Sequence, residues 1–215
     1  GPELPMPYIS IGGISNTEGI VRSTQIGNPS SIRSIAFPNL SEWNSLNYVP
    51  TSNWERIKAA QQRSLSLLTN EQGLVSRNFL NRQYYSEGFS RAEEIQDFAR
   101  LVPTWVEMQA LGGSTALRQT ARVALLAFKS GVSVAADLAI GGFDTHADHD
   151  RDHEPLLTEA LDAVDFLWDS AEELGLADRL VVVMGSDFSR SPGYNAGQGK
   201  DHWPIGSYLV MEKNA

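Results

Sequence analysis

The sequence contains no cysteine in its 215 residues. This absence excludes disulfide bonds, thiolate nucleophiles and cysteine-ligated zinc as features of the protein. It leaves the redox compartment in which the protein works open.

Basic residues and long apolar runs are also scarce. The chain has 17 Lys and Arg against 26 Asp and Glu, a formal net charge of −9 and a pI near 4.9. Because nucleic acid is bound mainly through Lys and Arg, this balance argues against nucleic-acid binding. No apolar run approaches the roughly 20 residues that cross a bilayer. The first residues, which begin with Gly1, lack the charged and apolar segments of a signal peptide.

The composition that remains, 41% hydrophobic and 20% charged, is typical of one globular domain with a core. Along the chain, three consecutive parts differ in composition and in the spacing of their apolar residues. Residues 1–50 are rich in Pro, Ser, Asn and Gly and predict surface connections, with one strand at residues 8–11. Residues 52–110 predict helices, and residues 112–211 alternate helix and strand patterns. We interpret the chain as a single α/β domain or the carboxy-terminal portion of one.

Residues 112–211 predict a mainly parallel sheet flanked by helices. A strand pattern at 132–140 precedes an apolar stripe at helical spacing over 155–174, and the wholly apolar run 180–184 comes next. Such a run is typical of a strand covered on both faces, and strand, helix, strand predicts two parallel neighbours joined by a right-handed crossover. The strand pattern at 205–211 follows a connection without a crossover helix, which favours an antiparallel placement.

All four histidines lie in the last third of the chain, in two aspartate-rich loops. The first loop follows the 132–140 strand and contains Asp144 and His146, with Thr145 between them facing away, and the second contains His202. Neutral imidazole and carboxylate are ligands of divalent transition metals, and open α/β sheets gather ligands at the carboxyl ends of their strands. We expect these three side chains to meet around a divalent ion, namely zinc, manganese or calcium. The alternative is a solvated polar loop whose aspartate caps the next helix.

Five further residues extend this candidate site. Asp187 follows the apolar strand and is expected to join the metal ligands, with a turn-capping role as the alternative. His149 is the best additional ligand in an Asp/His tract that otherwise favours the amino end of a helix. Asp201 is expected to orient the imidazole of His202 by contacting the ring rather than the metal. Arg190 and Lys200 are donors suited to an oxyanion, with solvent exposure as the alternative.

Three stretches carry a resemblance to a known family. They are Gly-Gly-Phe-Asp-Thr-His at 141–146, Val-Val-Val-Met-Gly-Ser-Asp-Phe-Ser-Arg-Ser-Pro at 181–192, and Gly-Lys-Asp-His-Trp-Pro at 199–204. Together they resemble the carboxy-terminal half of the family called domain of unknown function 1501, which is related to the alkaline phosphatase and sulfatase superfamily. The resemblance implies an alkaline-phosphatase-like fold in a bacterial protein that is periplasmic or otherwise exported.

The resemblance also implies roles for the site residues. Asp144, His146 and His202 would bind one metal ion, and Asp187 would bind a second together with a histidine that follows it. Phe188 stands where that histidine is expected, which puts a two-metal mechanism in doubt. The superfamily's first-strand metal-binding Asp and the nucleophile after it have no counterpart in residues 1–50. We therefore expect that the chain lacks its amino-terminal strand and associates with an amino-terminal segment or with itself.

Two functions follow from this interpretation. The first is a metal-dependent hydrolase acting on a small-molecule or polymeric anionic ester, either phosphate or sulfate, with the nucleophile unassigned. The alternative is a non-catalytic binding or scaffold protein of the same fold that is stabilised by its metal. Turnover of an ester would distinguish them.

Overall fold

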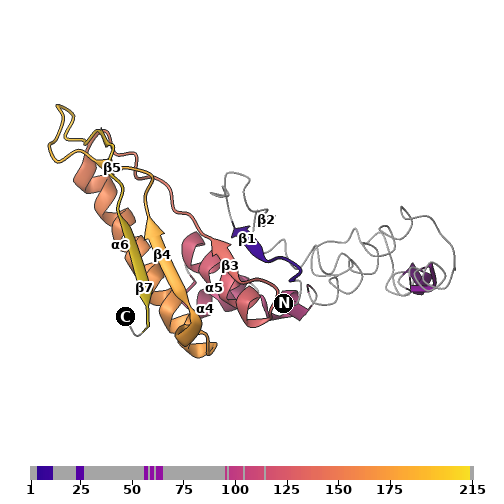
Figure 1. Cartoon of the computed structure of the whole chain (residues 1–215). Coiled ribbons are helices and arrows are strands. Elements are labelled where there is room, and N and C mark those ends of the chain that lie inside the picture. The colour runs from indigo at the N-terminus through magenta and orange to yellow at the C-terminus, as the bar shows by residue number, and fades with distance from the viewer. Residues whose placement is uncertain are drawn as a thin grey trace.

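The structure is a computed structural model that describes residues 4–11, 23–26, 56–57, 59–60, 62–64, 95, 97–103, 105–113 and 115–213. The described residues form a mixed α/β arrangement with a small parallel sheet and helices (Figure 1). Most of the predicted connections in 1–50 and of the predicted helical region 52–110 lie outside the described residues.

The parallel sheet has three strands in the order β2 (Thr24–Ile26), β1 (Tyr8–Ile11), β3 (Ala135–Asp137). The strand predicted at residues 8–11 is therefore confirmed as β1, and it is the central strand. Its Ile9 is fully buried and pairs with Thr24 on one side and Ala136 on the other. The strand predicted at 132–140 is shorter in the structure, because after β3 the chain continues without regular structure toward the candidate site.

Helix α5 (Ala116–Lys129) packs against this sheet and follows the short helix α4 (Trp105–Ala110). The Thr115 hydroxyl accepts a hydrogen bond from the Arg118 amide and caps the amino end of α5. Apolar side chains from the sheet, from α5 and from the helical residues 97–101 form one core, in which Ile9, Phe98 and Val123 are fully buried. Burying a side chain of this size stabilises the fold by about 1.5–3 kcal/mol.

Helix α6 (His149–Glu173) begins six residues earlier than the predicted start at Pro155, so that prediction is wrong. Pro155 lies inside the helix, where it can donate no hydrogen bond. The early start has two physical causes. The acidic Asp150 and Asp152 in the first turn favour the positive end of the helix dipole, and backbone oxygens of residues 197 and 198 accept from the amides of 148 and 149.

Helices α5 and α6 lie side by side and are joined by a second core and an ion pair. Leu125 of α5 and Ala171 of α6 are buried in this core. The guanidinium of Arg122 donates to both carboxylate oxygens of Glu173, at 2.7 and 2.9 Å. Since Arg122 is buried, this bidentate contact fixes how the two helices align.

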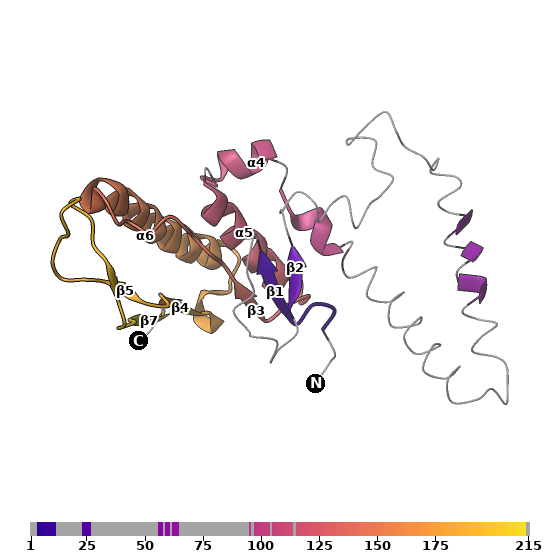
Figure 2. The ribbon, with the colours of Figure 1, turned by 90° about the horizontal axis from the view of Figure 1, so that it is seen from above.

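Strand β4 (Val181–Gly185) follows the short 3₁₀ helix η2 (Ala177–Arg179) and pairs antiparallel with β7 (Tyr208–Glu212). The predicted antiparallel placement of β7 is confirmed, but the predicted parallel pairing of β4 with β3 is wrong. The hydrogen bonds of β3 go to β1 and those of β4 go to β7, so α6 connects two separate sheets. Figure 2 shows the β4–β7 pair beside α6 and apart from the three-stranded sheet.

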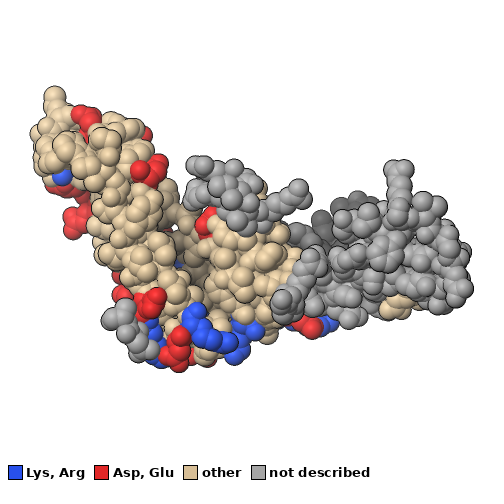
Figure 3. Space-filling view, viewed as in Figure 1, with Lys and Arg blue, Asp and Glu red and all other residues tan. Residues whose placement is uncertain are grey.

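The apolar run 180–184 was expected to form a strand covered on both faces, but one face of the β4–β7 pair is exposed to solvent. Val183 is 61% exposed, and its antiparallel partner Val210 is 63% exposed. Figure 3 shows that Lys and Arg side chains gather along the lower edge of the molecule, whereas the surface over β4 and β7 is mostly free of charge. The apolar composition of 180–184 thus predicted a strand correctly but not its surroundings.

The connection between β4 and β7 contains a second short antiparallel pair, β5 (Ser189–Arg190) and β6 (His202–Trp203). Arg190 lies opposite His202 in this pair.

Within the described residues, no helix combines the length and apolar character that crossing a membrane requires.

Candidate metal centre

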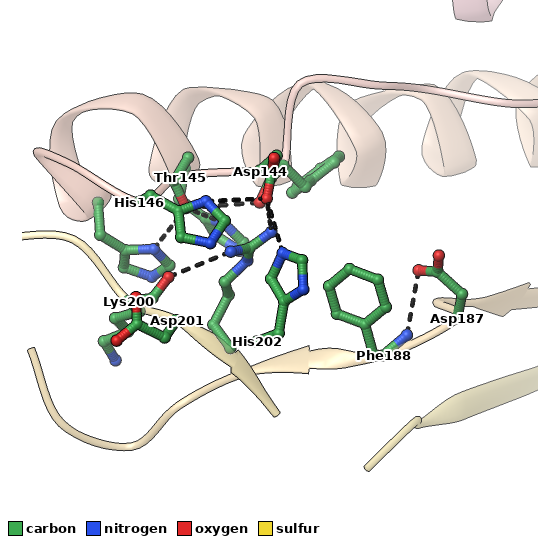
Figure 4. A network of polar contacts seen from close by, with 12 residues as sticks. Asp144, Thr145, His146, Asp187, Phe188, Lys200, Asp201 and His202 are labelled. Carbon is green, nitrogen blue, oxygen red and sulfur yellow. Dashed lines mark hydrogen bonds and ion pairs between the residues drawn. The ribbon is translucent and has the colours of Figure 1, made fainter. Parts of the chain in front are cut away.

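Two loops far apart in sequence bring Asp144, His146 and His202 together (Figure 4). Asp144 and His146 lie in the loop before α6, and His202 lies on β6. Oδ1 of Asp144 is 3.1 Å from Nδ1 of His146 and 3.1 Å from Nε2 of His202. One ligand atom from each residue lies within 4.8 Å of the other two. All three side chains are exposed, so an ion and a further ligand can reach them from solvent.

Arg190 approaches the same carboxylate from β5. Its Nη2 donates to Oδ1 of Asp144 at 2.5 Å, and its Nη1 donates to the backbone oxygen of Lys200 at 3.1 Å. The Arg190 hydrogen bond, followed by that of His202, lowers the pKa of Asp144 from 3.8 to about 2. Asp144 is therefore ionised at any physiological pH, as a metal ligand must be.

Asn195 links the two loops of the site. Its Nδ2 donates to the backbone oxygen of His146 at 3.0 Å and to the carboxylate of Asp201 at 3.1 Å. Its Oδ1 accepts from the amides of Gly197 and Gly199. One side chain thus holds the turn at 195–199 in shape and ties it to the loop before α6.

Gly199 lies where the two loops approach most closely. A Cβ added at this position would lie 1.9 Å from the backbone carbon and oxygen of His146. No real Cβ contact is that short, so only glycine allows this approach. The amide of the next residue, Lys200, donates to the backbone oxygen of Thr145 at 3.1 Å and continues the contact.

Thr145 faces away from Asp144 and His146, as the sequence predicts, and is buried against α6. Its hydroxyl forms a hydrogen bond of 2.7 Å with Nδ1 of His149 and a longer one of 3.5 Å with Nδ1 of His153. The pKa of His149 is lowered mainly by burial and next by the charge of Lys200. The pKa of His153 is also lowered mainly by burial, and next by His149. Both imidazoles are therefore neutral at pH 7, which suits hydrogen bonding to a buried hydroxyl.

The ring of Tyr194 lies beside the ring of His149, which bonds Thr145. Its hydroxyl donates to the carboxylate of Asp150 at 2.7 and 2.8 Å, and this bond raises the pKa of Tyr194. The ammonium of Lys200 lies 4.8 Å from the centre of the Tyr194 ring. The predicted oxyanion donor Lys200 is thus placed beside an aromatic ring at the rim of the site.

The other predicted site residues lie around the cluster rather than in it. Asp187 is separated from His202 by the ring of Phe188, and its carboxylate accepts from the Phe188 amide (Figure 4). The Asp201 carboxylate contacts Asn195, and His149 contacts Thr145. The structure therefore brings together Asp144, His146, His202 and Arg190 and leaves these three outside.

Sequence reasoning missed Asn195 and Gly199, and it considered His153 only as a member of the Asp/His tract and not as a partner of Thr145. The i, i+4 spacing of His149 and His153 would have placed them on one helix face, had the helix been predicted to start early enough. Asn195 and Gly199 lie in a connection without periodicity, where no local pattern shows which residue meets the other loop.

The donor chemistry of the cluster fits a divalent metal ion. Two imidazoles and one carboxylate are the set used by zinc sites that keep an open position, and manganese accepts the same mixture. Calcium requires six to eight oxygen ligands, so it fits less well.

One comparison with known proteins gives a match. The family model described as Protein of unknown function (DUF1501) matches residues 106–212, which include every residue of the cluster. This match supports the resemblance seen in the three motifs over that part of the chain. No curated protein and no solved structure matches the chain.

Proposed function

We propose that the protein binds one divalent metal ion through Asp144, His146 and His202 and acts in the hydrolysis of phosphate or sulfate esters. The observation that carries this proposal is the convergence of three ligand atoms within 4.8 Å from loops 56 residues apart, counted from His146 to His202. Zinc is favoured because two of the three donors are imidazoles, and manganese is compatible with the site through the carboxylate. Hydrolase activity and an exported location are what the motif resemblance at 141–146, 181–192 and 199–204 implies, and we include both in the proposal.

An ion bound here would supply Lewis acidity, which polarises an ester oxygen and makes a water or hydroxyl group easier to deprotonate. The chain's own residues supply charge and position. Arg190, which contacts Asp144, and Lys200, which lies over the Tyr194 ring, are the cationic donors that would bind an anionic ester. The nucleophile is unassigned, since the Thr145 hydroxyl is buried against α6.

The proposal is tested by turnover of aryl phosphate and aryl sulfate esters with zinc, manganese or calcium. We expect no appreciable turnover by this chain alone, because the described site holds a ligand cluster without an exposed nucleophile beside it. We expect metal-dependent turnover by a form extended upstream of Gly1, and its loss in Asp144→Ala. Metal binding without turnover by either form would instead support the metal-stabilised scaffold.

A further inference from the structure

Arg190 and the metal ion proposed above would bind the same carboxylate, that of Asp144. Oδ1 of Asp144 already accepts from Nη2 of Arg190 at 2.5 Å. A zinc or manganese ion binds a carboxylate oxygen at about 2.0–2.2 Å and carries two positive charges. A guanidinium hydrogen-bonded to the same oxygen would lie within a few ångströms of that ion, where two cations repel each other.

The Arg190 side chain is held firmly in this position. It is only 10% exposed, whereas the Asp144 side chain is 72% exposed. Its second nitrogen donates to the Lys200 backbone oxygen, and its guanidinium carbon lies 5.6 Å from the centre of the Phe188 ring. The bond to Asp144 is therefore one of several contacts of a largely buried cation, and breaking it leaves a charged donor that needs another anion.

We infer that Arg190 couples metal binding to oxyanion binding by exchanging partners between Asp144 and the anion. Without metal, Arg190 neutralises Asp144. When a divalent ion binds Asp144, the Nη2 group is released and becomes a donor for a sulfate or phosphate oxygen beside the ion. Because such coupling is reciprocal, the anion raises the affinity for the metal by the same factor as the metal raises the affinity for the anion. This inference rests on the proposed metal site and adds the specificity for a tetrahedral oxyanion.

The experiment is a calorimetric titration of the chain with manganese chloride, with and without sodium sulfate, at an ionic strength held constant with sodium chloride. For the unsubstituted chain, we expect sulfate to raise the manganese affinity roughly 5- to 20-fold, within the usual range of coupling between two sites. This arm needs no variant, so it does not depend on whether a substitution disturbs folding.

Arg190→Gln removes the competing positive charge and, with it, the charged donor for the anion. We expect this variant to bind manganese at least about 5-fold more tightly than the unsubstituted chain without sulfate, and to show no sulfate effect. Arg179→Gln, which removes the same charge at an exposed position of the η2 helix, is the matched control and should behave like the unsubstituted chain.

Unchanged or weaker manganese binding by Arg190→Gln, or a sulfate effect that survives the substitution, would overturn the role of Arg190 while leaving the metal site in place. Absence of manganese binding by every form would overturn both the metal site and this inference. The two failures are therefore distinguishable.

Discussion

The two loops of the site can approach each other only if residue 199 is glycine. Gly199→Ala would place a Cβ 1.9 Å from the backbone of His146, and neither backbone can yield without separating the two loops. We expect the affinity for manganese to fall at least about 10-fold, as is typical when the partners that orient metal ligands are displaced. Titration calorimetry measures the change. Gly193→Ala is the control, because a Cβ there meets nothing within 4 Å; equal binding by the two variants would show that the close approach is unimportant.

Thr145 lies between the proposed ligands Asp144 and His146, and its hydroxyl anchors this segment to His149 of α6. Thr145→Val keeps the shape of the side chain but leaves a buried ring nitrogen of His149 without its partner at 2.7 Å. We expect the free energy of unfolding to fall by about 1–3 kcal/mol, measured by urea denaturation. Thr145→Ser retains the hydroxyl and should recover most of the loss. A valine variant as stable as the unsubstituted chain would contradict this role for the hydroxyl.

How far the site could be predicted differs from residue to residue. Asp144, His146 and His202 are identifiable because their residue types are rare together, and because the first two follow a predicted strand while His202 shortly precedes one. The Arg190 contact with Asp144 was not predictable, because the pairing of β5 with β6 places Arg190 opposite His202 and no local pattern encodes that register.

At the scale of elements, the contact between α5 and α6 gives a prediction about pH. The Arg122 guanidinium lowers the pKa of Glu173 below its ordinary value of 4.5. Because the folded pKa is the lower one, the contact stabilises the fold fully above the unfolded pKa, and this contribution is lost as pH falls through the folded pKa. We expect Glu173→Gln to lower the free energy of unfolding by about 1 kcal/mol at pH 7, since Glu173 is largely exposed although Arg122 is buried.

The difference between Glu173→Gln and the unsubstituted chain should shrink as pH is lowered from 6 to 3, when followed by thermal unfolding. Glu154→Gln, which removes an exposed carboxylate elsewhere on the same helix, is the matched control. A Glu173→Gln difference that stays constant down to pH 3 would show that the ion pair does not contribute in this way.

Elements were predicted more reliably than their partners. The apolar periodicity of α5 and α6 and the β-branched run of β4 report local structure, so these elements were found. The pairing of β3 with β1 and of β4 with β7 depends on which edges meet after a helix of 25 residues, and periodicity carries no information about that. The start of α6 was missed because its first turn is stabilised by backbone oxygens of residues 197 and 198.

At the scale of the whole molecule, the outer face of β4 and β7 is an apolar surface. Val183, Val210 and Tyr208 are 61%, 63% and 71% exposed on it. Exposed apolar surface of this kind favours association, so we expect concentration-dependent self-association in analytical ultracentrifugation. Val183→Lys should weaken it, whereas Val106→Lys on α4, also an exposed valine, should not. A chain that stays monomeric at millimolar concentration would contradict this expectation.

The central claim is that Asp144, His146 and His202 bind one divalent ion, and titration of the unchelated chain with zinc or manganese decides it. We expect one ion per chain with saturable binding, reduced by at least about 100-fold in Asp144→Ala and unchanged in Asp162→Asn, an exposed carboxylate of α6 outside the cluster. Absence of saturable binding, or an affinity that Asp144→Ala leaves unaltered, would show that this cluster is an ion-pair network and not a metal centre.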